Sequence, residues 1–74
     1  MSVTRDENIL IAFGKNLQNI REEKKISLRQ LEILSEVDFS EIHRLEKGKR
    51  NPTLTVIIAL ANGLGIDRAD LINF

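Results

Sequence analysis

The chain has 74 residues, of which 42% are hydrophobic, so it suffices for one small domain with a single core. It contains no cysteine, which excludes disulfides, thiolate metal sites and a thiol nucleophile, and which fits a reducing cytoplasm. Eleven basic and eleven acidic residues give a net charge of zero. This balance excludes bulk attraction to polyanions but is compatible with a local basic patch.

The longest uninterrupted apolar run, from Val56 to Ala61, is far shorter than the roughly 20 residues that a membrane span requires. Asp6 and Glu7 occupy the place where a secretory signal peptide carries its basic and apolar regions. We therefore expect a cytoplasmic protein that is neither secreted nor inserted in a membrane.

The first predicted helix runs from about Asn8 to Lys24. Its apolar residues recur at three- and four-residue steps, which places them on one helical face. They are Ile9, Phe13, Leu17 and Ile20. Gly14 interrupts this helix at a cost of roughly 1 kcal/mol relative to alanine. It is either an imperfection on the surface or the point at which a neighbouring helix approaches closely.

Two short helices are predicted next. Ser27 and Gln30 have the spacing of a capping box, which begins one helix at about Leu28. The other runs from about Phe39 to Lys47 and is followed by Gly48, where a left-handed residue can close a helix. The side chains expected to face inward are Leu31, Leu34, Ile42 and Leu45.

A fourth helix is predicted after Thr53, which is a plausible N-cap. Its apolar residues fall at i, i+3, i+4 and i+7 on one face. They are Leu54, Ile57, Ile58 and Ala61. Gly63 and Gly65 are expected to end this helix, and Asp67 to cap a last one from about Arg68 to Phe74. Because no stretch alternates apolar and polar residues as a strand does, we expect an all-α single domain over residues 1–74.

About three residues, Glu36 to Asp38, join the two short helices, so the pair must cross steeply, as in a helix-turn-helix. The stretch ISLRQLEILSEVDFSEIHRLEKGKRNPTLTVIIALANGLGI resembles the Cro/phage-repressor (XRE-like) helix-turn-helix family of transcriptional regulators. The resemblance extends from about Phe13 to Phe74. Its specific feature is the ordered set IRE, SLRQL, SEIHRLEKGKRNP and LTVIIALANGLGI. It implies a compact five-helix lambda-repressor-like domain that binds DNA through a motif at about residues 27–48.

The resemblance also implies a salt bridge between Arg21 and Glu46, which joins the first helix to the end of the recognition helix. Each charge lies on the otherwise apolar inner edge of its helix, which is consistent with pairing. The alternative is two unrelated solvated charges. If the pair is partly buried, removing one partner should cost more than removing both.

Contacts with DNA bases are expected from the recognition helix, at Phe39, Ser40, Glu41 and Arg44. Arg44 is the strongest candidate, because a guanidinium can bridge O6 and N7 of guanine. Phe39 could contact a thymine methyl group or pack under the turn as part of the core. Glu41 points outward by helical spacing, and it could accept from N4 of cytosine or repel the DNA backbone.

Contacts with DNA phosphates are expected on both sides of the recognition helix, at Ser27, Arg29, His43, Lys47, Lys49 and Arg50. The basic residues after Arg44 form a local basic patch, whose structural alternative is an ordinary solvated loop. His43 is the only histidine, so no second ligand suggests a metal site around it.

Several residues depart from the family pattern. Leu28 replaces a glutamine that faces the groove in many members, Glu32 a small residue, and Glu36 a frequent turn glycine. Together with Asp38 and Glu41, these glutamates place negative charge close to the expected path of the DNA. They motivate a rival function, a protein-interaction module that keeps the fold without binding DNA.

Enzymatic functions find no support, because the chain has no paired histidines, no phosphate-binding loop and no glycine-rich dinucleotide turn. We expect no cofactor and no metal. The favoured function is a sequence-specific regulator of transcription that binds double-stranded DNA as a homodimer on a palindromic operator. An antitoxin or a restriction–modification controller would look much the same, so a toxin or polymerase is a possible protein partner.

A dimer would need an apolar surface near the C-terminal end of the sequence. The candidate contacts are Leu64, Ile66, Leu71, Ile72 and Phe74. For the first three, closure of the domain's own core explains the apolar side chains equally well.

Overall fold

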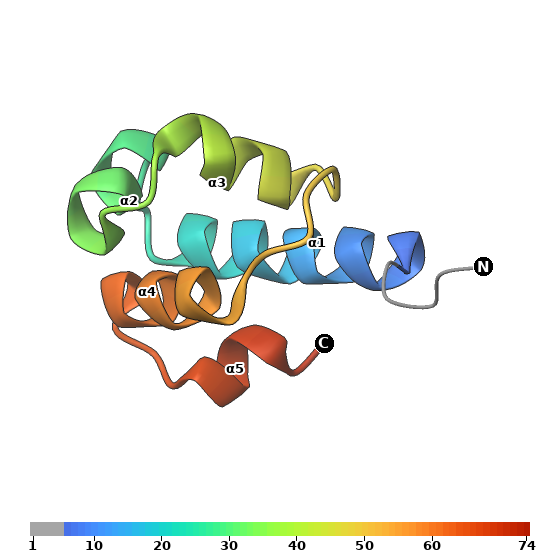
Figure 1. The fold of residues 1–74 in the computed structure, drawn as a ribbon. Helices are drawn as coiled ribbons and strands as arrows, with labels where there is room; N and C mark the ends of the chain where they lie inside the picture. Colours follow the sequence, from blue (N-terminus) through green and yellow to red (C-terminus); the bar gives the residue numbers. More distant parts are fainter. Residues whose placement is uncertain (1–5) are drawn as a thin grey trace.

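The computed structural model describes residues 6–74, so the first five residues of the expected domain lie outside the described part. Within residues 6–74, five helices follow one another with short links (Figure 1). They are α1 (Glu7–Glu23), α2 (Leu28–Ser35), α3 (Phe39–Glu46), α4 (Leu54–Leu64) and α5 (Arg68–Ile72). Residues 6–74 contain no strand, and the all-α prediction is confirmed.

The long helix α1 runs through the middle of the molecule in Figure 1, with α2 and α3 above it and α4 and α5 below. It contacts α3 on one side and α5 on the other, while α2 contacts both α3 and α4. Asn16 of α1 anchors the last helix, since its side-chain amide donates to the carbonyl of Leu71 at 2.8 Å. The α2–α3 pair is thus held on a scaffold of three helices.

The hydrophobic core draws at least one buried side chain from every helix. Its members are Leu10, Phe13, Leu17, Leu31, Val37, Ile42, Leu45, Leu60, Ala61, Leu64 and Leu71. Most of the side chains that periodicity placed inside are indeed buried or partly buried. Three are instead largely exposed: Ile9, Leu34 and Leu54.

Each of these errors is a rotation of the buried face by about one residue. In α1, Leu10 and not Ile9 continues the line of Phe13 and Leu17. In α2, Ser35 follows Leu31 one turn later and is buried, so Leu34 points away with 56% of its surface exposed. A small polar residue such as serine takes the inner position because α4 passes directly against it.

Helix α4 is apolar on nearly all sides, and its buried face was predicted only in part: Ala61 is buried and Ile57 packs against the core, as expected. The buried line is Leu60, Ala61 and Leu64, whereas Leu54 in the first turn is 66% exposed. Gly63 lies inside the helix, which ends at Leu64. A Cβ atom built on Gly63 would lie 2.9 Å from Cβ of Ser35, so the absence of a side chain here lets α2 and α4 approach closely.

Gly14 marks a second close approach, between α1 and α3. A Cβ atom at this position would lie 2.3 Å from the carbonyl oxygen of Leu45 and 2.6 Å from that of Glu46. Ordinary carbon–oxygen contacts are far longer, so the helices could not pack at this distance with any side chain here. Of the two interpretations of Gly14, the structure therefore supports close helix approach.

The turn between α2 and α3 bends at Glu36, which has the left-handed backbone conformation (φ 60°) that favours glycine. We predict that Glu36→Gly stabilises the domain by about 0.5–1 kcal/mol, because relief of the backbone strain exceeds the added freedom of the unfolded chain. Urea unfolding of both proteins measures this difference. Gly65, which has the same conformation (φ 71°) with open space around it, provides the control. Gly65→Ala should destabilise by a similar amount, and an unchanged midpoint in both variants would contradict the prediction.

Candidate nucleic-acid interface

A buried ion pair fixes α3 to the scaffold. Nε of Arg21 lies 2.6 Å from Oε2 of Glu46, and Nη2 lies 3.0 Å from Oε1, so the guanidinium holds the carboxylate with two parallel hydrogen bonds. The side chains of Arg21 and Glu46 are only 11% and 2% exposed. A third bond runs from Nη1 to the carbonyl of Ile26 at 2.9 Å, just before α2. The hydrogen bonding of the guanidinium to the Glu46 carboxylate raises the pKa of Arg21 above its ordinary value.

The Arg21–Glu46 pair was expected from the family resemblance, and the structure contains it. Its geometry connects three segments. Arg21 lies in α1, and its guanidinium contacts Glu46 at the end of α3 and the carbonyl of Ile26 just before α2. A bidentate pair of this kind adds directional precision as well as energy. The orientation of α3 on α1 is therefore set by directional bonds in addition to apolar packing.

Side-chain caps define the beginnings of α2 and α3. The hydroxyl of Ser27 accepts from the amide of Gln30 at 3.1 Å, and the Gln30 side chain accepts from the amide of Ser27 at 2.7 Å, so the predicted capping box is confirmed. Asp38 caps α3 by accepting from the amide of Ser40 at 3.0 Å. Its carboxylate also accepts a hydrogen bond from the Ser40 hydroxyl, which lowers the pKa of Asp38.

The hydrogen bonding of Ser40 bears on its candidate role. Its hydroxyl proton is directed at Asp38, so in this state the hydroxyl offers only acceptor capacity to an outside group. Asp38 thus serves the fold as a cap and neutralises part of the helix N-terminal dipole. Asp38 is one of the acidic residues near the expected path of the DNA, and its structural function is to cap α3.

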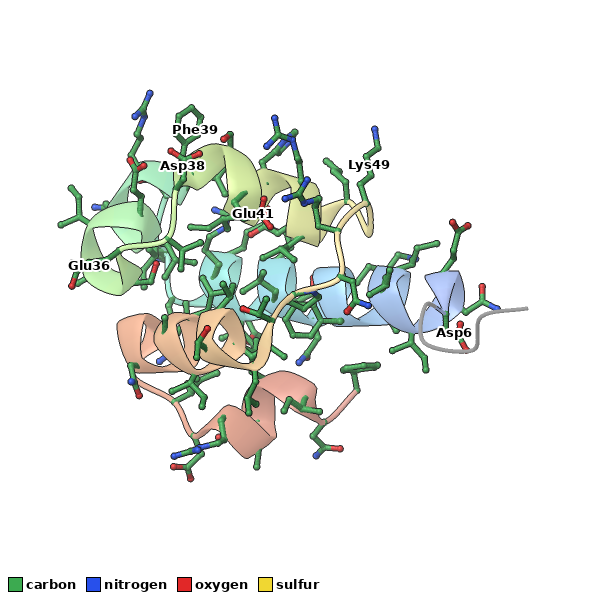
Figure 2. All side chains as sticks on the ribbon, in the orientation of Figure 1. Asp6, Glu36, Asp38, Phe39, Glu41 and Lys49 are labelled. Carbon is green, nitrogen blue, oxygen red and sulfur yellow. The ribbon has the colours of Figure 1, made fainter. Side chains whose placement is uncertain are left out.

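Phe39 lies at the outer end of α3 and is not part of the core. Figure 2 shows its ring pointing away from the body of the molecule. The guanidinium carbon of Arg29 lies over this ring, 3.8 Å from its centre. Nη1 of Arg29 also lies 3.4 Å from Oε1 of Glu32, whose other oxygen accepts from the amide of Phe39 at 3.1 Å. Of the two alternatives for Phe39, the structure excludes packing under the turn.

The central and C-terminal parts of α3 carry the exposed basic residues. His43, Arg44 and Lys47 are all exposed. Within residues 6–74, the side chain of Arg44 takes part in no hydrogen bond or salt bridge that would hold it against the protein. Lys49 follows on the turn after Gly48 and points to the same outer side as Phe39 (Figure 2). These side chains form one outward surface along α3.

Glu41 and Arg50 form a salt bridge across this surface. Oε1 of Glu41 lies 3.3 Å from Nε of Arg50, and the two side chains are 25% and 55% exposed. The pairing gives Glu41 a partner within the protein, and it keeps Arg50 close to α3. It therefore competes both with acceptance from cytosine by Glu41 and with a phosphate contact by Arg50.

The acidic residues that motivated the rival function can now be placed. Glu32 bonds Arg29 and the start of α3, Asp38 caps α3, and Glu41 pairs with Arg50. Only Glu36, at the bend of the turn, is exposed without such a contact within residues 6–74. Three of the four acids are therefore offset by donors of the protein itself.

Comparison with known proteins identifies this arrangement. Residues 17–71 match the family model described as Helix-turn-helix. The chain belongs to the helix-turn-helix family. A relative from Haemophilus influenzae, an uncharacterized HTH-type transcriptional regulator, is 41% identical over 61 residues, which cover 82% of this chain and 62% of that protein. A second such regulator, from Sinorhizobium fredii, is 32% identical over 80% of this chain and 77% of its own length.

The repressor RghR of Bacillus subtilis is 41% identical over 74% of this helix-turn-helix chain, but the match covers only 42% of RghR. The chain thus spans less than two thirds of the Haemophilus influenzae and Bacillus subtilis relatives. Among solved structures, the restriction-modification controller protein C.AhdI from Aeromonas hydrophila has a TM-score of 0.82 at 37% identity, covering 84% of this chain and 94% of that one. The clp gene regulator ClgR from Corynebacterium glutamicum has a TM-score of 0.80 at 26% identity, covering 86% and 83%.

In helix-turn-helix terms, α2 and α3 are the two motif helices, and all the candidate base and phosphate residues lie on or beside them. Sequence reasoning missed two features of this surface, the position of Arg29 over Phe39 and the bond of Glu32 to the start of α3. Spacing alone gives no signal for either, because both join residues seven or more positions apart on different helices.

The candidate dimer residues separate into two groups. Leu64 and Leu71 are buried in the helix-turn-helix core, and Ile66 packs against it, so for these three core closure is the correct explanation. Ile72 and Phe74 are exposed. Together with Ile9 and Pro52 they border a shallow apolar hollow of about 170 Å³ between α1 and α5.

Two further findings concern the helix-turn-helix chain as a whole. No helix within residues 6–74 is both long and apolar enough to cross a bilayer. The same residues contain no group of three or more histidine, aspartate or glutamate side chains that could hold a metal ion.

Proposed function

We propose that this helix-turn-helix domain binds double-stranded DNA in a sequence-specific manner and regulates transcription, with α3 as the recognition helix in the major groove. The observation that carries the proposal is the outward surface of α3, on which Arg44 projects with no competing partner in residues 6–74. The Arg21–Glu46 pair holds this helix at a fixed angle. Precise positioning of a recognition helix matters because base edges are read by directional hydrogen bonds.

Basic residues flank this surface and supply the attraction to phosphates. Ser27 and Arg29 lie at the start of α2, and Lys47, Lys49 and Arg50 follow α3. Such contacts fix the register of a protein on the duplex and carry little sequence information. The similarity to transcriptional regulators supports the same function.

A single motif reaches only a few base pairs, so we propose that the domain acts as a homodimer on a palindrome with half-sites about 34 Å apart. The exposed apolar side chains of Ile72 and Phe74 are the dimer contacts in this proposal. As a regulator acting on genomic DNA, the protein would work in the cytoplasm in association with the nucleoid. Catalysis forms no part of this function.

A restriction–modification controller is a second candidate within the same class. The similarity to C.AhdI favours it, because that controller is matched over 94% of its length at 37% identity. A controller should bind operators close to the genes of a methyltransferase and an endonuclease, whereas an antitoxin should bind beside a toxin gene. Mapping the bound sites on the source genome separates these two forms.

The test of DNA binding is selection from a random duplex pool at low salt and at two higher salt concentrations. We expect enrichment of a palindrome, with an affinity that falls linearly on a log–log plot against salt. An absence of both enrichment and salt-dependent binding would contradict the proposal. It would favour the rival function, in which the surface around Phe39 binds a protein.

Arg44 and Lys49 should differ in their effects on binding. Arg44→Ala should cost about 1–3 kcal/mol on the selected site and relax specificity at one base pair, because a bidentate contact with guanine is lost. Lys49→Ala should weaken binding to all sequences alike and lower the salt slope by about one. Titrations of both variants against the selected and a scrambled duplex measure these effects. Equal losses on the two duplexes for Arg44→Ala would contradict a base-reading role.

A further inference from the structure

Arg29 and Phe39 come from different helices of the motif but behave as one unit. Arg29 lies in the first turn of α2, and Phe39 is the first residue of α3. The guanidinium carbon lies 3.8 Å from the centre of the aromatic ring. A cation at this distance over a ring is attracted by the negative face of its π-system. The Phe39 ring therefore fixes the position of the Arg29 guanidinium.

Glu32 holds both members of this unit. One carboxylate oxygen lies 3.4 Å from Nη1 of Arg29, and the other accepts the backbone amide of Phe39 at 3.1 Å. The carboxylate is three-quarters buried, so it provides a firm support beneath the pair. Arg29 is nevertheless 69% exposed, and most of its five N–H donors face solvent.

The location of the unit suits contact with bases. The N-terminal residues of a recognition helix are those that touch base edges, and Phe39 begins that helix. The ring brings Arg29 to the same end of α3, which points outward in Figure 2. The two neighbouring candidates are engaged otherwise, because the Ser40 hydroxyl bonds Asp38 and Glu41 pairs with Arg50.

The chemistry of the two groups defines what they would read. A guanidinium recognises O6 and N7 of guanine, and an aromatic ring makes apolar contact with the thymine methyl group. Their separation of 3.8 Å is close to the roughly 3.4 Å between successive nucleotides of one DNA strand. Two groups held at this spacing can address two adjacent base pairs at once.

We propose that Arg29 and Phe39 form a composite reader for a guanine and a thymine in adjacent base pairs of the operator. This inference rests on the proposed DNA binding and assigns Arg29 a base contact where the sequence suggested a phosphate contact. Specificity at the two positions is then coupled, since loss of the ring also releases the guanidinium.

The test combines two variants with two altered duplexes. Arg29→Lys keeps the charge but loses the forked donors, and Phe39→Leu keeps apolar bulk but loses the ring. The selected operator is prepared with 7-deazaguanine, which lacks the N7 acceptor, at the guanine that adjoins a thymine, or with uracil, which lacks the methyl group, at that thymine. All other guanines, including the one assigned to Arg44, stay unmodified. Lys47→Gln serves as the control for a phosphate contact. Thermal melting of each variant establishes that it is folded.

We expect the wild type to lose about 10-fold or more in affinity on the 7-deazaguanine duplex. Arg29→Lys should show a much smaller difference between the two duplexes, because an ammonium lacks the planar fork of donors. Phe39→Leu should become insensitive to uracil and should also lose most of its preference for guanine. Lys47→Gln should keep both preferences. Retention of the wild-type base preferences in Arg29→Lys would overturn the composite reader while leaving DNA binding intact. Absence of any enriched site with the wild type would instead overturn the proposed function together with this inference.

Discussion

Arg21→Ala should destabilise the domain by about 3–5 kcal/mol, measured as the loss in the free energy of unfolding in urea. The variant leaves the Glu46 carboxylate, only 2% exposed, without its partner. It also removes the donor to the carbonyl of Ile26. A domain of this size has a stability on the order of several kcal/mol, so the variant should be partly unfolded in buffer. Arg21→Lys should be destabilised less than Arg21→Ala, because an ammonium keeps the charge. It should still be less stable than the wild type, because an ammonium cannot form both bonds.

The double variant Arg21→Met with Glu46→Leu provides the decisive comparison. Replacing both partners with apolar side chains avoids burying a lone charge, so we expect the double variant to be more stable than Arg21→Ala. Glu22→Ala is the control, because this glutamate is exposed and lies 3.9 Å from Arg21, where we expect less than about 0.5 kcal/mol. Losses under about 1 kcal/mol for Arg21→Ala would contradict a structural role for the pair.

Gly14→Ala should destabilise the domain by about 2–3 kcal/mol, although the same change in an isolated helix stabilises it by about 1 kcal/mol. The sign reverses because the added methyl group would meet backbone carbonyl oxygens of α3 at 2.3 and 2.6 Å. Backbone atoms cannot rotate away as a flexible side chain can, so α1 and α3 must separate. Urea unfolding measures the effect.

A matched variant separates this packing effect from helix propensity. Lys15 lies next to Gly14 on the exposed side of α1. Lys15→Ala should change the free energy of unfolding by less than about 0.5 kcal/mol. Gly14→Ala should in addition weaken DNA binding, because α3 moves with its carbonyl groups. A more stable Gly14→Ala protein would show that the two helices adjust without cost.

Local chemistry made much of this fold predictable from the sequence. The capping box of Ser27 and Gln30 and the left-handed glycine at position 48 are signals that act within a few residues. The five helices were therefore placed to within about two residues of their observed ends. The Arg21–Glu46 pair, 25 residues apart, was expected because the family resemblance supplied it.

It was less predictable which face of each helix is buried, because this depends on how the helix is oriented about its own axis. Helix α4 has apolar residues on almost every side, with only Thr55 and Asn62 polar on its exposed face, and Leu60 was missed as a core residue. Leu34 was predicted to face inward, yet the close contact with Gly63 places the smaller Ser35 on the inner side. At the candidate site, the contact of Arg29 with Phe39 depends on the angle between two helices, which spacing does not encode.

The salt bridge between Glu41 and Arg50 has a consequence for how the protein searches a genome. Glu41 is a counterion that the protein itself supplies to Arg50, so in the proposed DNA complex a phosphate would compete with this carboxylate for the guanidinium. The freed carboxylate restores a negative charge beside the DNA, so the net release of counterions should be smaller and the salt dependence shallower than the number of basic residues suggests. On random DNA sequences Arg44 would make no base contact. A phosphate would then have to compete with Glu41 for Arg50 without that compensation. The proposed DNA complex would therefore be weak on wrong sites, and its affinity for the operator would depend on base contacts such as that of Arg44.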